Sequence, residues 1–149
     1  MNLEENIMAE LKTAMKNKDK VALEALRAVK SAILMAKTAG GKETALSAEA
    51  EISILQKQIK QRKESAEQFS AQDRKEMAEL ELAQAAVIEK FLPKQLTENE
   101  IEEILGSIIA ETGAIGMKDM GKVMGLASEK MAGKADGKTI STLVKKLLG

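Results

Sequence analysis

The side chains that most often perform chemistry are unevenly represented in this chain. Its 149 residues include no histidine, cysteine, tryptophan or tyrosine. Without a thiol or an imidazole there is no thiolate nucleophile, no imidazole base and no ordinary zinc, haem or iron–sulfur ligand set. With only 2 phenylalanines, the chain also lacks the base-stacking platform of single-strand-binding proteins. Carboxylates, hydroxyls and lysines remain as candidate functional groups.

The carboxylates and serines do not form a recognisable catalytic set. Glu102 with Glu103, and Glu64 with Glu67, are close in sequence, but both pairs fall at solvated positions of amphipathic helical patterns. General acid–base catalysis needs a carboxyl group with a shifted pKa, and nothing near these pairs indicates such a shift. Ser128 has no histidine to activate it, and a serine–lysine pair cannot be inferred from spacing alone. We therefore predict no catalytic residue, no metal site and no cofactor.

One segment, GKADGKT at residues 133–139, ends in G-K-T like a phosphate-binding loop. That loop requires four residues between its glycines and a strand before it. Here three residues separate the glycines, and the preceding segment has helical periodicity. We predict a turn between two helices, with Asp136 as the N-cap of the second. The N-terminus of that helix, beside Lys134 and Lys138, could attract one RNA phosphate, for which Asp136 would compete.

Apolar periodicity predicts an all-α protein. A composition rich in helix formers carries apolar residues at three- and four-residue intervals in seven stretches. In the fourth stretch, Asp73 and Glu76 fit a capping box. The predicted helices lie at about residues 3–17, 19–40, 47–69, 73–91, 97–112, 117–131 and 138–148. Their predicted apolar stripes include Met15, Leu34, Met77, Leu80 and Leu147.

The only proline, Pro93, marks a boundary because it cannot continue a helix and biases Leu92 away from helical geometry. We predict an N-terminal bundle of about four helices at residues 1–93 and a small C-terminal three-helix domain at residues 97–149. No apolar run approaches the roughly 18 residues of a membrane span, and the acidic N-terminus does not resemble a signal peptide. We expect a soluble, cytoplasmic protein with no membrane contact.

Charge is distributed unevenly along the neutral chain. Residues 1–93 are balanced, residues 94–112 carry a net charge of −4 and residues 113–149 a net charge of +4. The last segment could attract phosphates through its field and through counterion release. Alternatively, its charges form a solvated face balanced by the preceding acidic helix. The basic residues concerned are Lys118, Lys122, Lys130, Lys134, Lys138, Lys145 and Lys146.

Two glycines, Gly121 and Gly125, fall inside the predicted sixth helix. Each costs a helix about 1 kcal/mol relative to alanine. We expect close helix–helix packing to offset this cost, and the alternative is a bare surface for an RNA or protein partner. The 9 methionines are expected to fill the core, or else to line an adaptable partner groove.

Three stretches together resemble a known family. They are LQKQIKQRKES at residues 55–65, FLPKQL at residues 91–96, and a third that runs from AETGA at 110–114 through MKDMGKVM at 117–124 to GKADGK at 133–138. In combination they resemble the stand-alone YqeY-like members of the GatB/YqeY domain family. The resemblance covers essentially the whole chain.

This resemblance implies an all-helical fold similar to the C-terminal region of the B subunit of the tRNA-dependent amidotransferase. In that enzyme a small tail helps to engage tRNA, whereas phosphorylation and transamidation occur in a separate cradle. The chain has no stretch for a cradle or an amidase, so a carbon–nitrogen ligase activity with glutamine as amido-N donor carries over only as an association. Matching tail positions inherit a possible tRNA-facing role: Lys118, Lys122, Lys134, Gly137 and Lys138.

Three functions remain open from the sequence. The first is a non-catalytic module that binds tRNA or a tRNA-processing complex by shape and backbone contacts. The second is a protein-interaction or assembly factor without RNA contact, which uses a Met-lined groove or the basic outer face of the third helix. The third is an accessory part of a glutamine-dependent carbon–nitrogen ligase. Lysines that converge on one surface would favour the first, and scattered lysines the second. The basic face comprises Lys57, Lys60, Gln61, Arg62 and Lys63.

Overall fold

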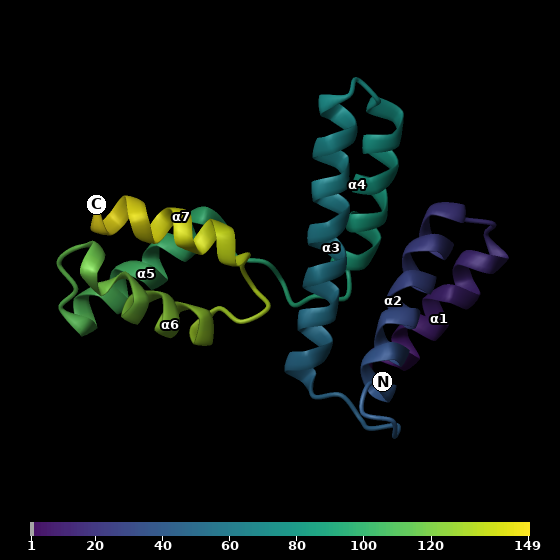
Figure 1. Ribbon diagram of the computed structural model, residues 1–149, viewed down its shortest axis with the longest axis horizontal. Helices are drawn as coiled ribbons and strands as arrows, with labels where there is room; N and C mark the ends of the chain where they lie inside the picture. Colours follow the sequence, from purple (N-terminus) through teal and green to yellow (C-terminus); the bar gives the residue numbers. More distant parts are fainter. Residues whose placement is uncertain (1) are drawn as a thin grey trace. The chain divides into compact units, whose positions relative to one another are not determined.

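The computed structural model describes residues 2–149 and confirms the predicted all-α class (Figure 1). No strand occurs among these residues. The helices are α1 (Leu3–Lys16), α2 (Lys20–Thr38), α3 (Ala48–Ala71), α4 (Lys75–Glu89), α5 (Glu98–Thr112), the 3-10 helix η1 (Met117–Asp119), α6 (Met120–Lys130) and α7 (Gly137–Leu148).

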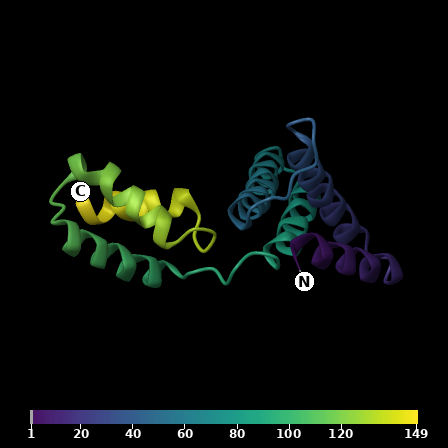
Figure 2. The same ribbon diagram turned by 90° about the horizontal axis from the view of Figure 1, so that it is seen from below.

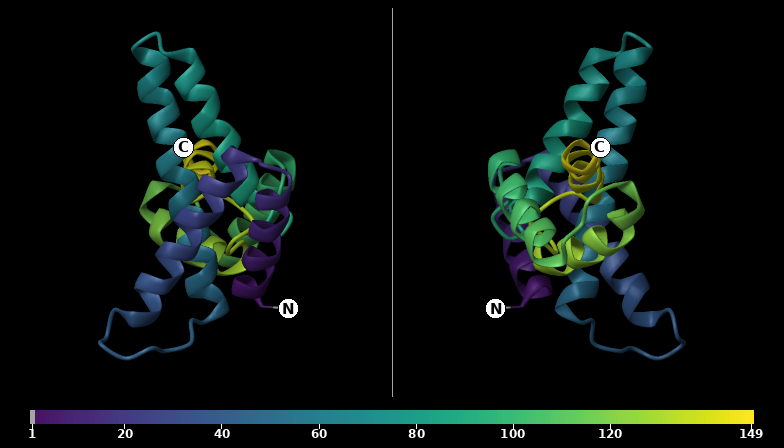
Figure 3. Two further views of the ribbon diagram at one scale, coloured as in Figure 1. Left: turned by 90° about the vertical axis from the view of Figure 1, so that its right-hand side faces the viewer. Right: turned by 90° about the vertical axis from the view of Figure 1, so that its left-hand side faces the viewer.

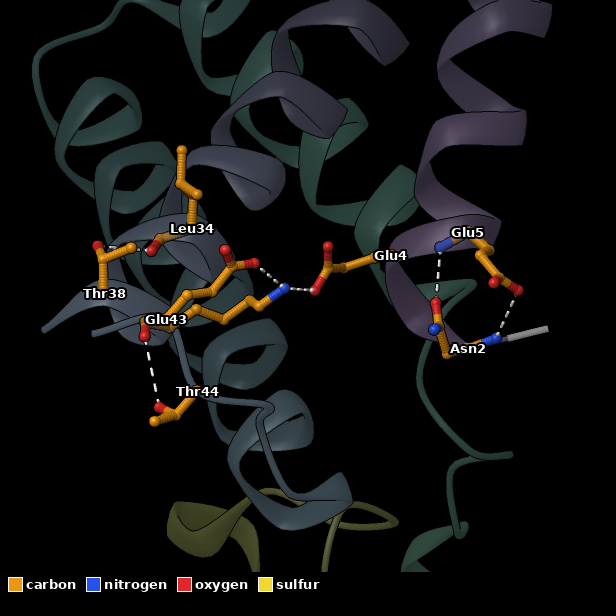
Figure 4. A network of polar contacts seen from close by, with 8 residues as sticks. Asn2, Glu4, Glu5, Leu34, Thr38, Glu43 and Thr44 are labelled. Atoms are coloured by element: carbon orange, nitrogen blue, oxygen red, sulfur yellow. Dashed lines mark hydrogen bonds and ion pairs between the residues drawn. The ribbon is translucent and has the colours of Figure 1, made fainter. Parts of the chain in front are cut away.

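Predicted caps fix the start of several helices. The Glu5 amide donates to Asn2 Oδ1 at 2.9 Å, and the Asn2 amide donates to Glu5 Oε2 at 3.2 Å, which closes a capping box on α1 (Figure 4). Thr97 and Glu100 form the same reciprocal pair on α5. Because these bonds join residues only three positions apart, local sequence is enough to specify them.

The start of α4 differs from the prediction. Asp73 has a φ of 60° and lies in the turn after α3, and Arg74 occupies the N-cap position without a side-chain cap bond. The Arg74 amide instead donates to the Phe69 carbonyl at 2.8 Å. Aspartate tolerates the left-handed region better than most residues, so Asp73 ends α3 rather than capping α4. The predicted capping box with Glu76 is therefore wrong.

The chain divides into two compact units, Met1–Leu92 and Pro93–Gly149. The first contains α1 to α4 and the second contains α5 to α7 with η1. Each unit can be followed by itself from further directions in Figures 2 and 3. Each has its own hydrophobic core.

In the first unit, α2 packs against α1, α3 and α4, while α3 and α4 run side by side as a helical hairpin (Figure 1). Leu26, Val29 and Ile33 of α2 lie at the centre of the core. Predicted stripe residues that prove exposed are Met15, Leu34, Met77 and Leu80. On α1 and α4, alanines are buried instead, because small side chains let the helices approach closely: Ala14, Ala78 and Ala85.

Arg62 does not lie on an outer basic face of α3, as predicted, but links three helices. Its Nε donates to Gln84 Oε1 on α4 at 3.0 Å, and Gln84 Nε2 donates to Glu24 Oε2 on α2 at 2.9 Å. Burial lowers the pKa of the Arg62 guanidinium, which remains charged. Lys63 pairs with Glu89 at 3.0 Å. The predicted basic face is thus partly used for internal contacts.

The second unit packs α5, α6 and α7 around a separate core. Leu105, Ile108, Val123 and Val144 are fully buried there. On α7, Leu148 rather than the predicted Leu147 faces the core. Across residues 2–149, no helix combines the length and apolarity needed to cross a membrane.

Candidate nucleic-acid interface

The five residues that the sequence singled out all lie on the second unit, and all are exposed. Lys118 is in η1 and Lys122 is in the first turn of α6. Lys134 lies in the turn after α6, and Gly137 and Lys138 begin α7. These residues therefore occur in two groups, one at each end of α6.

The separation of the two groups follows from the length of α6. This helix has 11 residues, which at 1.5 Å per residue gives about 16 Å between its ends. The lysines thus do not converge on one point. A nucleic acid that contacts both groups would therefore have to span this distance.

Two other lysines of the second unit are engaged by the acidic helix α5. Lys130 lies 3.7 Å from Glu111, and Lys146 lies 3.2 Å from Glu102. Both pairs are solvent-exposed and contribute little to stability. Within residues 2–149, the other five lysines of the basic segment 113–149 have no ion-pair partner within 4 Å: Lys118, Lys122, Lys134, Lys138 and Lys145. The balancing of the basic segment by the acidic helix is therefore partial.

The GKADGKT segment forms the predicted helix–helix turn. The preceding element is α6, so the strand that a nucleotide-binding loop requires is replaced by a helix. Gly133 has a φ of 74°, which favours glycine. Asp136 is the N-cap of α7, as predicted, and its Oδ1 accepts from the Lys138 amide at 3.4 Å. A phosphate at this helix N-terminus would have to displace that carboxylate.

The segment before α5 holds this turn in place, a feature that the sequence did not reveal. The Gln95 side-chain nitrogen donates to the carbonyl oxygens of Gly133 and Pro93, both at 2.8 Å. The Leu96 amide donates to the Lys134 carbonyl, also at 2.8 Å. Two of the stretches that resemble the YqeY-like proteins are thus in direct contact. Their joint presence in the sequence was the only signal that could have suggested it.

The expected packing role of Gly121 and Gly125 is wrong. Both are exposed, and a Cβ built at either position meets no atom within 4 Å. Val123 and Ala127 provide the buried face of α6 instead. The glycines consequently leave a strip of bare helix backbone on the outer side of α6, next to Lys118 and Lys122, with no internal contact to offset their cost.

The chemistry of this surface is electrostatic. Exposed lysine ammonium groups can donate to phosphate oxygens, which positions a nucleic acid without reading its sequence. Both phenylalanines, Phe69 and Phe91, belong to the first unit, so the second unit offers no aromatic stacking. In the described part of the chain, no three acidic residues are grouped so as to hold a metal ion. The surface is therefore suited to backbone contacts.

The fold and this surface define an all-helical, two-unit protein with accessible lysines at both ends of one helix. A sequence profile of the family described as "Yqey-like protein" matches residues 4–148. The chain belongs to this family, which confirms the predicted resemblance.

Individual relatives extend this result. The chain is 33% identical over 146 residues to "Altered inheritance of mitochondria protein 41, mitochondrial" of Pyrenophora tritici-repentis, covering 96% of this chain and 79% of the relative. It is 29% identical over 126 residues to the protein of the same name in Meyerozyma guilliermondii, covering 80% and 64%. Both are named as mitochondrial proteins, so the expected cytoplasmic location of the present chain stays a prediction.

A shorter similarity involves a tRNA enzyme. The chain is 42% identical over 55 residues to the E subunit of the glutamyl-tRNA(Gln) amidotransferase of Thermococcus gammatolerans. The match covers 34% of this chain but only 9% of that relative. The similarity thus spans about a tenth of the amidotransferase chain.

Proposed function

We propose that this protein is a non-catalytic, tRNA-associated helical module whose C-terminal unit contacts the RNA backbone. Lys118 and Lys122 would meet phosphates at one end of α6, and Lys134 and Lys138 at the other. Gly137, where a Cβ would meet nothing within 4 Å, would allow the start of α7 to approach the backbone closely.

The observation that carries this proposal is that the four lysines singled out by the family resemblance are all available for binding. All four are exposed, and none has an ion-pair partner within 4 Å in the described chain, whereas Lys130 and Lys146 are held by α5. An unpaired ammonium group loses no internal partner when it binds a phosphate, and it releases condensed counterions from the RNA. The bare strip at Gly121 and Gly125 lies on the same helix and adds a surface without side-chain obstruction.

The partial similarity to the amidotransferase supports tRNA as the class of RNA. That relative's name refers to glutamyl-tRNA(Gln). A shared segment of 55 residues is too short to carry the whole activity of the relative. A binding role is the part of its function that such a segment can share, and an accessory role in amide transfer would require other chains.

The proposal is tested by the salt dependence of tRNA binding. We expect purified tRNA to bind at about 50 mM salt and to dissociate as salt is raised to about 200 mM. Each lysine–phosphate contact contributes about 0.7–0.9 to the slope of log K against log salt. Replacing Lys118, Lys122, Lys134 and Lys138 together by alanine should therefore reduce the magnitude of the slope by about 3.

A matched control removes the same charge from the first unit. Lys12, Lys16, Lys57 and Lys60 are also exposed and lack ion pairs among residues 2–149. Their joint replacement by alanine should leave the affinity nearly unchanged. Absence of tRNA binding at the lower salt concentration, or an equal loss in both quadruple variants, would contradict the proposal.

A further inference from the structure

A small apolar groove lies between α1 and α2, in the unit that does not carry the lysine surface. It has a volume of about 120 Å³. Ile7 and Ile33 are almost completely buried and form its floor, whereas Met8 and Leu34 remain exposed at its sides. Its lining residues are Glu4, Ile7, Met8, Lys30, Ile33 and Leu34.

The exposed side chains at the groove are large and apolar. Leu34 is 57% exposed and its neighbour Met35 is 72% exposed. Single exposed apolar residues are ordinary, but here two of them, Met8 and Leu34, line one hollow, and Met35 follows Leu34 in the chain. Methionine adapts its shape to different partners. A hollow of 120 Å³ is somewhat smaller than the roughly 150 Å³ cavity that admits benzene, so it fits one large apolar side chain.

One side of the groove is positively charged. Lys30 lines it, and Arg27 lies three residues earlier, on the same face of α2. Neither has an ion-pair partner within 4 Å in the part of the chain described. The acidic residue at the groove, Glu4, is already bonded at 2.9 Å to Lys37, whose ammonium also binds Glu43 (Figure 4). Taken together, Glu4, Glu43, Lys37, Arg27 and Lys30 carry a net charge of +1.

We propose that this groove docks an amphipathic helix of a partner protein, with acidic residues beside its apolar stripe. One apolar side chain of the partner would enter the hollow over Ile7 and Ile33 and act as the anchor of the interface. Neighbouring stripe residues would cover Met8 and Leu34, in the manner of helix-in-groove recognition. Acidic residues on the partner would pair with Arg27 and Lys30.

The combination of cationic and apolar surface favours an acidic amphipathic helix over RNA as the occupant of the groove. A nucleic acid would meet Arg27 and Lys30 but would leave Met8, Leu34 and Met35 without apolar contact. A helix with acidic residues beside an apolar stripe satisfies both the cationic and the apolar parts of the surface. The inference is independent of tRNA binding, which involves the other unit.

The test is a selection from a display library of helical peptides with randomised stripe and flanking positions, performed on the full-length protein. We expect enrichment of large apolar residues at positions i, i+4 and i+7, with aspartate or glutamate beside them. NMR shifts on addition of a selected peptide should be largest at Met8, Lys30 and Leu34. Recovery of no binder, or of binders with basic flanks, would overturn the proposal.

Variants locate the binding site. Leu34→Glu should weaken binding of the selected peptide by about tenfold or more, as loss of an anchoring contact does. Leu80→Glu is the matched control, because Leu80 on α4 is 53% exposed and lies outside the groove. It should leave binding unchanged. Lys30→Glu should weaken binding of the acidic peptide. It should strengthen binding of a variant peptide whose acidic residues are replaced by lysine. Equal effects of Leu34→Glu and Leu80→Glu would refute the site.

Two other occupants would also overturn the proposal. Sedimentation with vesicles of anionic phospholipid that is lost in Leu34→Glu would assign the groove to a membrane surface. A concentration-dependent dimer in analytical ultracentrifugation, also lost in Leu34→Glu, would assign it to a second copy of the chain. Under the proposal the chain stays off such vesicles, remains monomeric, and binds tRNA equally well with or without Leu34→Glu.

Discussion

Gln95→Met tests whether the segment before α5 holds the lysine-bearing turn. The substitution keeps the length of the side chain but removes the nitrogen that donates to the Gly133 and Pro93 carbonyls at 2.8 Å. Gly133 is buried and its bond to Gln95 is partly buried, so its carbonyl oxygen would be left without this donor. An unsatisfied buried acceptor costs about 1–3 kcal/mol. We therefore expect the C-terminal unit to lose about 2 kcal/mol of stability.

Amide hydrogen exchange on the full-length protein measures this loss locally. A change of about 2 kcal/mol corresponds to roughly 30-fold faster exchange where the turn opens together with its unit. We expect the increase at amides of residues 131–149, and no increase in the first unit. The midpoint of thermal unfolding of the C-terminal unit should also fall by about 10 °C, since a loss of 1 kcal/mol lowers the midpoint of a small domain by about 4–8 °C.

The matched control is Gln61→Met on α3. Gln61 is exposed and makes no side-chain hydrogen bond within residues 2–149, so exchange should not change. Gln95→Glu also removes the donor and should behave like Gln95→Met. Unchanged exchange in both Gln95 variants would show that the bond to Gly133 contributes nothing to the turn.

Three further predictions follow from the second unit. Gly121→Ala and Gly125→Ala should each raise stability by up to about 1 kcal/mol, measured by thermal unfolding, because the added Cβ meets nothing; a loss of stability would contradict this open surrounding. Hydrogen bonds from the Thr97 backbone and side chain lower the pKa of Glu100 below its ordinary value. The stability that these hydrogen bonds provide is present above the pKa that Glu100 has in the unfolded chain. It is lost as pH falls through the lower pKa that Glu100 has in the folded chain. NMR titration of Glu100 should show the shift, and Thr97→Val should reduce it. A fragment that begins at Pro93 should be more stable in urea than one that begins at Thr97, which lacks the Gln95 and Leu96 bonds; equal midpoints would contradict this.

Local signals in the sequence predicted the helices and several of their caps. The pairs Asn2–Glu5 and Thr97–Glu100 bond across three residues, so their spacing alone was informative. The same spacing at Asp73 misled, because the backbone uses that residue in the left-handed region to end α3. A capping pattern thus predicts a side-chain cap bond only where the backbone of the first residue of the pattern is free to take the N-cap conformation.

The buried faces were harder to predict because they depend on the neighbouring helix. The apolar pattern of α4 permits more than one inward face, and its contact with α3 selects Ala78 and Ala85 while Leu80 stays exposed. For the same reason, the open surroundings of Gly121 could not be read from its position in a helix.

The candidate site was predicted as a set of residues but not as an arrangement. The resemblance to the YqeY-like proteins singled out the site lysines within a basic segment, and turn chemistry predicted the Asp136 cap. The bond from Gln95 to Gly133 joins residues 38 positions apart, and no local pattern encodes such a distance. The division of the lysines between the two ends of α6 required the length of that helix.

The connection between the two units has a consequence for any pair of ligands they bind. Leu92 packs against the first core, and Gln95 is already hydrogen-bonded within the second unit, so only Pro93 and Lys94 lie between these anchored positions. A tether this short keeps the effective concentration of one bound ligand near the other at about the millimolar level, provided that both can be held at once. For two ligands that are linked to each other, weak affinity at each unit would then suffice for tight binding, and lengthening the tether with inserted glycines and serines would loosen that binding without altering either individual affinity.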